Sequence, residues 1–125
     1  MVILADTSVW IGHLRSGNSL FKSFLEEGVI VMHPCVRCEL SLGSMKNRVE
    51  ILGLLAALPQ TNIATEDEVL FAIEKKKLWG LGIGWVDVQL LAATRITPSC
   101  SLWTFDGPLR KACEVAGAKL FHGAV

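Results

Sequence analysis

Short, continuous apolar runs alternate with stretches of helical periodicity along this chain. A strand buried on both faces reads as an unbroken hydrophobic run, whereas an amphipathic helix repeats its apolar positions about every three to four residues. On this basis we expect strands at residues 2–5, 29–32, 60–64, 101–105 and 119–121. Helices are expected between them, at residues 7–15, 20–26, 34–42, 48–58, 66–79, 86–95 and 108–116.

This alternation predicts an α/β fold in which helices cover both faces of a central parallel sheet. The 125 residues fit one domain with one core, and no linker or repeat divides them, so we expect a single domain over 1–125. Ligands of such sheets bind beyond the carboxyl ends of the strands. Two acids follow predicted strands at that edge, Asp6 in MVILADTSVW and Asp106 in SLWTFDGPL.

Two further acids lie in apolar settings on predicted helices. Glu39, in PCVRCELSLG, follows Cys35 by four residues and shares with it a helix face that is not plainly polar. Asp87, in GIGWVDVQLLAAT, heads the apolar stripe that Leu90 and Leu91 continue. Acids seldom turn inward unless they are paired, hydrogen-bonded or bound to metal. We therefore expect these helix acids and the two strand-end acids to converge on one edge of the sheet.

Each acid also has an ordinary explanation. Asp6 and Asp106 both precede a helix and would serve as N-caps, and Pro108 fits the start of the second helix. Asp87 would complement a helix dipole, and Glu39 would be a surface residue. Taken together, however, four converging carboxylates repel one another unless a cation neutralises them. Oxygen ligands favour Mg²⁺ or Mn²⁺ over zinc, and such an ion supports phosphodiester hydrolysis by polarising the phosphoryl group and activating water.

Composition limits the classes of function. Lysine plus arginine and aspartate plus glutamate number 12 each, so the net charge is zero and a strong basic field for nucleic acid is absent. Hydrophobic residues make up 51% of the chain, which is high for a small monomer and indicates an apolar surface that a partner covers. Neither a membrane-spanning run nor a signal-peptide pattern is evident, so we expect a cytoplasmic protein without membrane contact.

The motifs LADTSVW, CELSLG, WVDVQLLAAT and LWTFDGPL, in this order, resemble the four acidic motifs of PIN-domain ribonucleases, and in particular of the VapC toxins of toxin–antitoxin pairs. The resemblance covers nearly the whole chain. It implies a three-layer α/β/α PIN-like fold and an Mg²⁺- or Mn²⁺-dependent endoribonuclease. It also implies catalytic and metal-binding roles for Asp6, Glu39, Asp87 and Asp106, with Ser8 and Thr104 as supporting hydroxyls. Phe105 and Gly107 depart from the pattern, since many members carry polar or charged residues around the last motif.

The same resemblance implies an RNA substrate, a VapB-like antitoxin and a homodimer. The apolar content of the first two predicted helices points in the same direction, because one helix face cannot easily bury all of it. We expect part of it to line a groove that accepts an amphipathic helix, whose Arg or Lys would reach the acids. The residues concerned are Trp10, Ile11, Leu14, Leu20, Phe21, Phe24 and Leu25.

Other signals favour other functions less well. Cys35-x-x-Cys38 suggests zinc, but the remaining two cysteines are not a close pair. The glycine-rich loop at residues 80–84 follows a helix rather than a strand, so it is not a dinucleotide fingerprint, and we expect it to aim Asp87 at the sheet edge.

Phosphoryl-transfer and signalling domains on a similar sheet form a second class of function. A haloacid-dehalogenase-type phosphatase needs a second aspartate where this chain has Ser8. A receiver domain needs an aspartate at a middle strand end, and after residues 60–64 only Glu66 is found. A catalytically silent interaction module of the PIN-like fold remains a third possibility.

Overall fold

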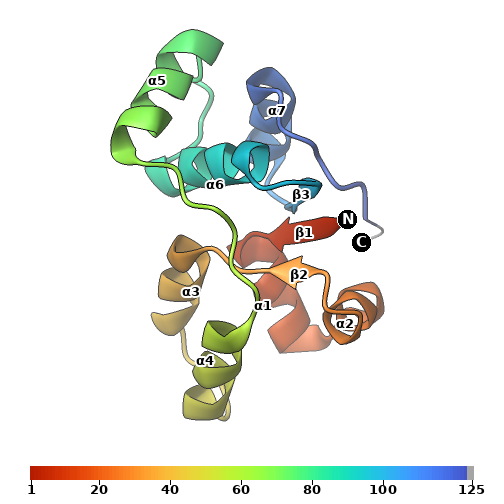
Figure 1. Ribbon diagram of the computed structural model, residues 1–125. Helices are drawn as coiled ribbons and strands as arrows, with labels where there is room; N and C mark the ends of the chain where they lie inside the picture. Colours follow the sequence, from red (N-terminus) through yellow and green to blue (C-terminus); the bar gives the residue numbers. More distant parts are fainter. Residues whose placement is uncertain (124–125) are drawn as a thin grey trace.

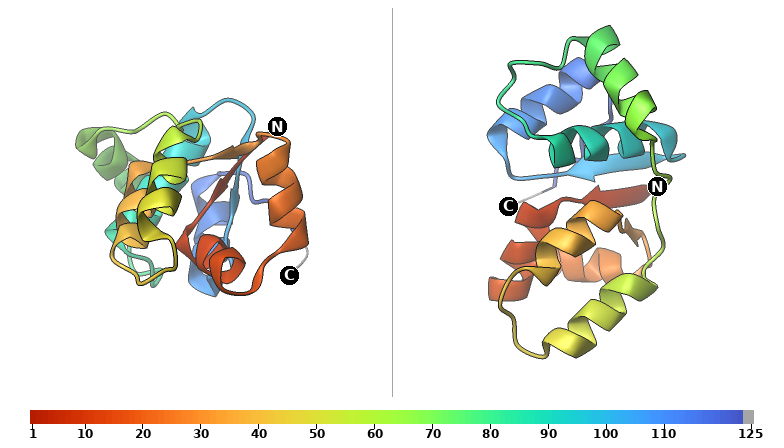
Figure 2. Two further views of the ribbon diagram at one scale, coloured as in Figure 1. Left: turned by 90° about the horizontal axis from the view of Figure 1, so that it is seen from below. Right: turned by 90° about the vertical axis from the view of Figure 1, so that its left-hand side faces the viewer.

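The computed structural model describes residues 1–123, which form three layers (Figure 1). A parallel three-stranded sheet lies between two sets of helices, α1 to α4 on one face and α5 to α7 on the other, as Figure 1 and the right-hand view of Figure 2 show. This arrangement confirms the predicted α/β/α architecture. The elements are β1 (Val2–Ala5), α1 (Thr7–Ser16), α2 (Ser19–Glu26), β2 (Ile30–Val31), α3 (Pro34–Ser41), α4 (Arg48–Ala57), α5 (Glu66–Lys76), α6 (Trp85–Ile96), β3 (Cys100–Trp103) and α7 (Gly107–Ala116).

Strand β1 occupies the centre of the sheet, whose order is β2-β1-β3. Ile3 and Leu4 are fully buried because helices cover both faces of the sheet, which explains the continuous apolar run. In the register of the sheet, Ala5 pairs with Trp103. The residues that follow these two, at the carboxyl ends of β1 and β3, are therefore neighbours in space although they are far apart in the sequence.

Two of the expected strands are wrong as full strands. Residues 60–64 contribute only an isolated bridge between Met32 and Gln60. Asn62 bonds to the end of α6 instead of to the sheet. Its backbone N–H donates to Thr97 Oγ1, and its side-chain amide donates to the Ile96 carbonyl. These two hydrogen bonds take the place of the strand pairing that was expected for residues 60–64.

Residues 119–121 likewise pair with the sheet at a single position, between Leu102 and Leu120. The expected helix over 66–79 is too long at its end. Helix α5 ends at Lys76 because Lys77 takes a left-handed conformation, with φ 57°. A left-handed residue cannot continue a right-handed helix.

Helices α1 and α2 leave several of their apolar side chains only partly buried, as expected. Trp10 and Phe21 are buried and pack edge to face with ring centroids 4.7 Å apart. The other apolar side chains of the set are only partly buried against the core, namely Ile11, Leu14, Leu20, Phe24 and Leu25. Within residues 1–123, no helix has the length and apolar character needed to cross a membrane.

Candidate functional site

Asp6 is a buried carboxylate at the point where β1 ends and α1 begins, with 6% of its surface exposed. Its Oδ1 accepts hydrogen bonds from Ser8 Oγ at 2.5 Å and from the Val9 N–H at 3.2 Å, and its Oδ2 accepts one from Thr104 Oγ1. Burial raises the pKa of Asp6 above its ordinary value of 3.8, these hydrogen bonds lower it, and the charge of Asp87 raises it again. The bond from Val9 is the predicted N-cap. Capping alone does not require the burial or the two hydroxyl donors.

Thr104 joins the carboxyl ends of the two paired strands. Its side chain is fully buried, and its hydroxyl both donates to Asp6 and accepts from the Asp106 N–H at 3.0 Å. Ser8 makes a parallel link, since its Oγ accepts from the Phe105 N–H at 3.1 Å. Both hydroxyls named from the sequence thus contact the Asp6 carboxylate and tie it to the segment after β3.

Asp87 is the third residue of α6 and is partly buried. Its Oδ2 accepts from the Gly84 N–H at 3.2 Å, so the glycine-rich loop does fix this carboxylate, as expected. Burial raises the pKa of Asp87, the Gly84 bond lowers it, and the charges of Asp106 and Glu39 raise it. Since Asp6 also feels the charge of Asp87, each of the other three predicted acids lies within electrostatic reach of Asp87.

Glu39 is not the inward-facing acid that the helical pattern predicted. It is exposed, because α3 buries the face that carries Val36 and Leu40 and leaves Glu39 at the rim. It still points to the acid edge, where its Oε1 accepts from Thr7 Oγ1 at 2.6 Å. Sequence reasoning missed Thr7, although its position directly after Asp6 in a hydroxyl pair was a usable signal.

Asp106 is exposed and caps α7, with its Oδ2 accepting from the Leu109 N–H at 3.0 Å. The N-cap explanation is therefore confirmed for both strand-end acids. One turn further along α7, Arg110 Nη1 donates to the Thr104 carbonyl at 3.1 Å, which places a cation beside the acids. The sequence analysis did not single out Arg110, and the i, i+4 spacing from Asp106 was its only signal.

The remaining sequence signals lead elsewhere. Cys35 and Cys38 are free thiols, and Cys35 Sγ donates to Gln89 Oε1 at 3.5 Å. His33 is buried as the N-cap of α3, where its Nδ1 accepts from the Cys35 N–H at 3.0 Å. An accepting Nδ1 is unprotonated, which is consistent with burial lowering the pKa of His33. His33 thus caps helix α3, the Cys35 thiol joins this helix to Gln89 of α6, and Cys38 is exposed.

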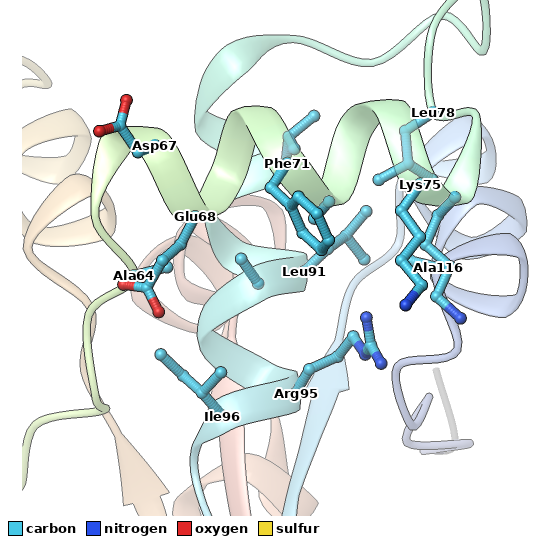
Figure 3. Close-up of a pocket in the computed structure, with 14 residues that line it drawn as sticks. Ala64, Asp67, Glu68, Phe71, Lys75, Leu78, Leu91, Arg95, Ile96 and Ala116 are labelled. Carbon is cyan, nitrogen blue, oxygen red and sulfur yellow. The ribbon is translucent and has the colours of Figure 1, made fainter.

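A separate groove of about 460 Å³ runs between α5 and α6 (Figure 3). Its floor is apolar, with Leu91 at the centre and Phe71 over it, while Lys75 and Arg95 point toward one end and Glu68 lies at the other. None of the four acids borders this groove. The acid edge and the α5–α6 groove are therefore distinct features of the surface.

Comparison with known proteins decides the family. Residues 3–115 match the PIN domain family, a span that contains all four acids. The chain is also 43% identical over 119 residues to proteins named Ribonuclease VapC32 from two strains of Mycobacterium tuberculosis, CDC 1551 / Oshkosh and ATCC 25618 / H37Rv, and the match covers 95% of this chain and 96% of each relative. The chain belongs to the VapC family of PIN-domain proteins. The resemblance drawn from the four motifs is thus confirmed.

The acid edge of this VapC-family protein offers a donor set of oxygen atoms only, which suits Mg²⁺ or Mn²⁺. Burial and neighbouring acids disfavour the charged forms of Asp6 and Asp87, so a cation there would relieve a real electrostatic cost. Within residues 1–123, however, no three His, Cys, Asp or Glu side chains are arranged to hold one ion. Mg²⁺ in proteins commonly binds through about one or two carboxylates, with water and substrate phosphate completing its shell, and Asp6 and Asp87 would be the carboxylates at this edge.

Proposed function

We propose that this chain is an endoribonuclease that hydrolyses RNA phosphodiester bonds with the help of Mg²⁺ or Mn²⁺. The observation that carries the proposal is the convergence of Asp6, Asp87, Glu39 and Asp106 on one edge of the sheet, where the pKa of the two less exposed acids is raised. Membership of the VapC family and the name ribonuclease of its relatives support the same activity.

Each acid has a distinct role in this proposal. Asp6 and Asp87 are the ligands of the ion, because burial and hydrogen bonds hold both in place. When bound, the ion supplies charge for the phosphoryl oxygens and activates water. Glu39 is exposed at the rim, where Thr7 Oγ1 donates to its Oε1. From there it would orient a water molecule and accept a proton from it. Asp106 is the weakest ligand candidate, since one of its carboxylate oxygens caps α7.

Ser8 and Thr104 position the acids rather than react. Both donate to Asp6, and a donor to a carboxylate stabilises its charged form, which is the form that binds a cation. Arg110 adds a cation whose reach is set by its bond to the Thr104 carbonyl. It would contact a phosphate of the substrate next to the acids, where the net charge of zero provides no general attraction for RNA.

The test is RNA cleavage by protein purified free of any partner, with Mg²⁺, with Mn²⁺ and with EDTA. We expect cleavage with either metal and none with EDTA. Asp87→Asn keeps an acceptor for the Gly84 N–H and should remain folded, but lose activity by several orders of magnitude. Val115→Ala, on the exposed face of α7, serves as a matched control and should cleave normally. Full activity in folded Asp87→Asn would remove the metal-site proposal, and an inactive wild type would favour the silent interaction module.

We further propose that the chain acts in the cytoplasm as the toxin of a VapBC-type pair, as a homodimer restrained by a VapB-like antitoxin. A groove of about 480 Å³ between α1, α3 and α4 supports this, since Ile11, Leu14 and Leu40 line it and Glu39 borders it. Leu42 and Val49 nearby are 88% and 85% exposed. A helix seated in this groove would bury apolar surface and could extend an Arg or Lys to the acids.

The partner proposal is tested by co-expression with the neighbouring small open reading frame. A stable complex, loss of cleavage in that complex and a dimer by sedimentation would support it. A chain that stays monomeric at high concentration, leaves its host unharmed and captures no product of that reading frame would contradict the toxin role, even if the acids bind metal.

A further inference from the structure

Phe105 presents an aromatic ring to solvent in the middle of the acid edge. It lies between Thr104 and Asp106, and 38% of its surface is exposed. Its backbone N–H donates to Ser8 Oγ at 3.1 Å, and the Ser8 hydroxyl donates to Asp6 Oδ1 at 2.5 Å. Two hydrogen bonds in series thus hold the backbone of Phe105 at a fixed position relative to the most buried acid.

The ring of Phe105 is fixed as well. It meets the buried indole of Trp103 edge to face, with centroids 6.2 Å apart and planes at 82°. Gly12 of α1 lies near the ring as well, since a Cβ at this position would be 3.9 Å from the ring atom Cε2. Glycine inside a helix costs about 1 kcal/mol relative to alanine. A side chain at this position would contact the ring, which the glycine does not.

An open, fixed ring beside a phosphodiester site suits a nucleotide base. The chain has zero net charge and four acids at this edge, so RNA gains little from long-range attraction there. Stacking on an aromatic ring needs no charge and tolerates any base, and it contributes about 1–3 kcal/mol per base. The base attached to the scissile phosphate, or the base next to it, lies within the reach of one nucleotide from the acids.

We propose that Phe105 is the stacking platform for a base flanking the scissile phosphate and so helps to hold the RNA in place beside the acids. This inference rests on the proposed ribonuclease activity. Because stacking binds substrate and transition state alike, its loss should raise KM and leave kcat nearly unchanged. Because it is not ionic, the effect should also be the same at low and at high salt.

The experiment starts by mapping the cuts that the wild type makes in total bacterial RNA with Mn²⁺. A synthetic oligoribonucleotide that carries the strongest cut is then used with Phe105→Leu, Phe105→Tyr and the control Phe71→Leu. Phe71 is an exposed phenylalanine in the α5–α6 groove, whose lining contains none of the four acids of the acid edge. We expect Phe105→Leu to raise KM about 5- to 150-fold, the factor equivalent to about 1–3 kcal/mol, while Phe105→Tyr and Phe71→Leu stay near wild type.

Substrates with an abasic nucleotide on either side of the cut identify the stacked base. The abasic change at that nucleotide should raise KM for the wild type but add nothing for Phe105→Leu, because both changes remove the same contact. Gly12→Leu provides a second variant that leaves Phe105 in place. Its side chain should cover the ring, raise KM and keep the protein folded, since leucine favours helix.

The outcomes separate this inference from the proposed activity. A wild type that makes no cuts rejects both. If the wild type cuts but Phe105→Leu shows an unchanged KM, or a loss confined to kcat that the abasic substrates do not reproduce, only the stacking role is rejected. If Phe105→Leu cleaves normally but binds the antitoxin less tightly, Phe105 contacts the protein partner and the proposal is again wrong.

Discussion

Replacing Thr104 with valine tests whether the hydroxyl network at the end of β3 holds the acid edge together. Valine has nearly the same shape but no hydroxyl, so Asp6 Oδ2 loses a donor and the Asp106 N–H loses its acceptor. A hydrogen bond to a charged group contributes about 1.5–3 kcal/mol and an ordinary one about 0.5–1.5 kcal/mol. Burying a methyl group instead of a hydroxyl recovers part of this. We expect Thr104→Val to lower the free energy of unfolding by about 1–4 kcal/mol.

The loss should depend on pH, because the Thr104 hydroxyl donates to the ionised form of Asp6. This bond is one of the factors that lower the pKa of Asp6, against the larger effect of burial. Its contribution to stability is therefore present when Asp6 is charged and disappears as the pH falls through the folded-state pKa, which lies above 3.8. The gap between wild type and Thr104→Val should be widest at neutral pH and narrow toward acid.

Urea denaturation followed by circular dichroism at several pH values measures both effects, with EDTA present so that metal does not contribute. Thr104→Ser is the matched control, because it keeps the hydroxyl and loses only a buried methyl group. If Thr104→Val is as stable as Thr104→Ser, or if its deficit stays constant from neutral to acid pH, the bond to the Asp6 carboxylate does not act as described.

Three further predictions concern metal, histidine and a helix end. Mn²⁺ at about 100 times its Kd should stabilise the wild type by about 2.7 kcal/mol and so raise its melting temperature, but should leave that of Asp87→Asn unchanged. An equal shift in both proteins would place the ion elsewhere. Burial lowers the pKa of His33 below 6.5, so stability should fall as the pH decreases from 6.5 to the folded-state pKa. His33→Asn retains a capping oxygen and should lose that part of the pH dependence, as measured by unfolding in urea. Lys77→Gly should stabilise the protein by about 1 kcal/mol in thermal unfolding, because glycine adopts the left-handed conformation at the end of α5 without strain, and no gain would mean that the Lys77 side chain makes a compensating contact.

The central strand and most helices could be predicted because their signals are local. The run at β1 and the N-cap at Asp6 need no knowledge of distant residues. Residues 60–64 and 119–121 were overpredicted as strands because pairing depends on which backbone groups meet. The Asn62 side chain donates to the Ile96 carbonyl at the end of α6, and residues 119–121 pair with β3 only between Leu102 and Leu120.

The proximity of the predicted acids follows in part from the sequence, and their surroundings follow from it less. Strand ends in a parallel sheet share an edge by topology, so the proximity of Asp6 and Asp106 follows from the alternation of elements. The exposure of Glu39 depends on how α3 rotates against its neighbours, and a helix with only two buried apolar positions specifies that rotation weakly. The partnership of Glu39 with Thr7 joins residues 32 apart, and no local pattern encodes it.

The central place of β1 also governs when the acid edge can form during synthesis. Asp6 is made well before the hydroxyl that bonds its Oδ2, which comes 98 residues later, on the segment that follows the neighbouring strand β3. Chains emerge from the ribosome N-terminus first, at about 5–20 residues per second. For most of translation Asp6 therefore has neither Thr104 nor the strand that would bury it. A growing chain therefore cannot assemble the acid edge before the segment after β3 has been made, so the proposed activity would be delayed until that point of translation.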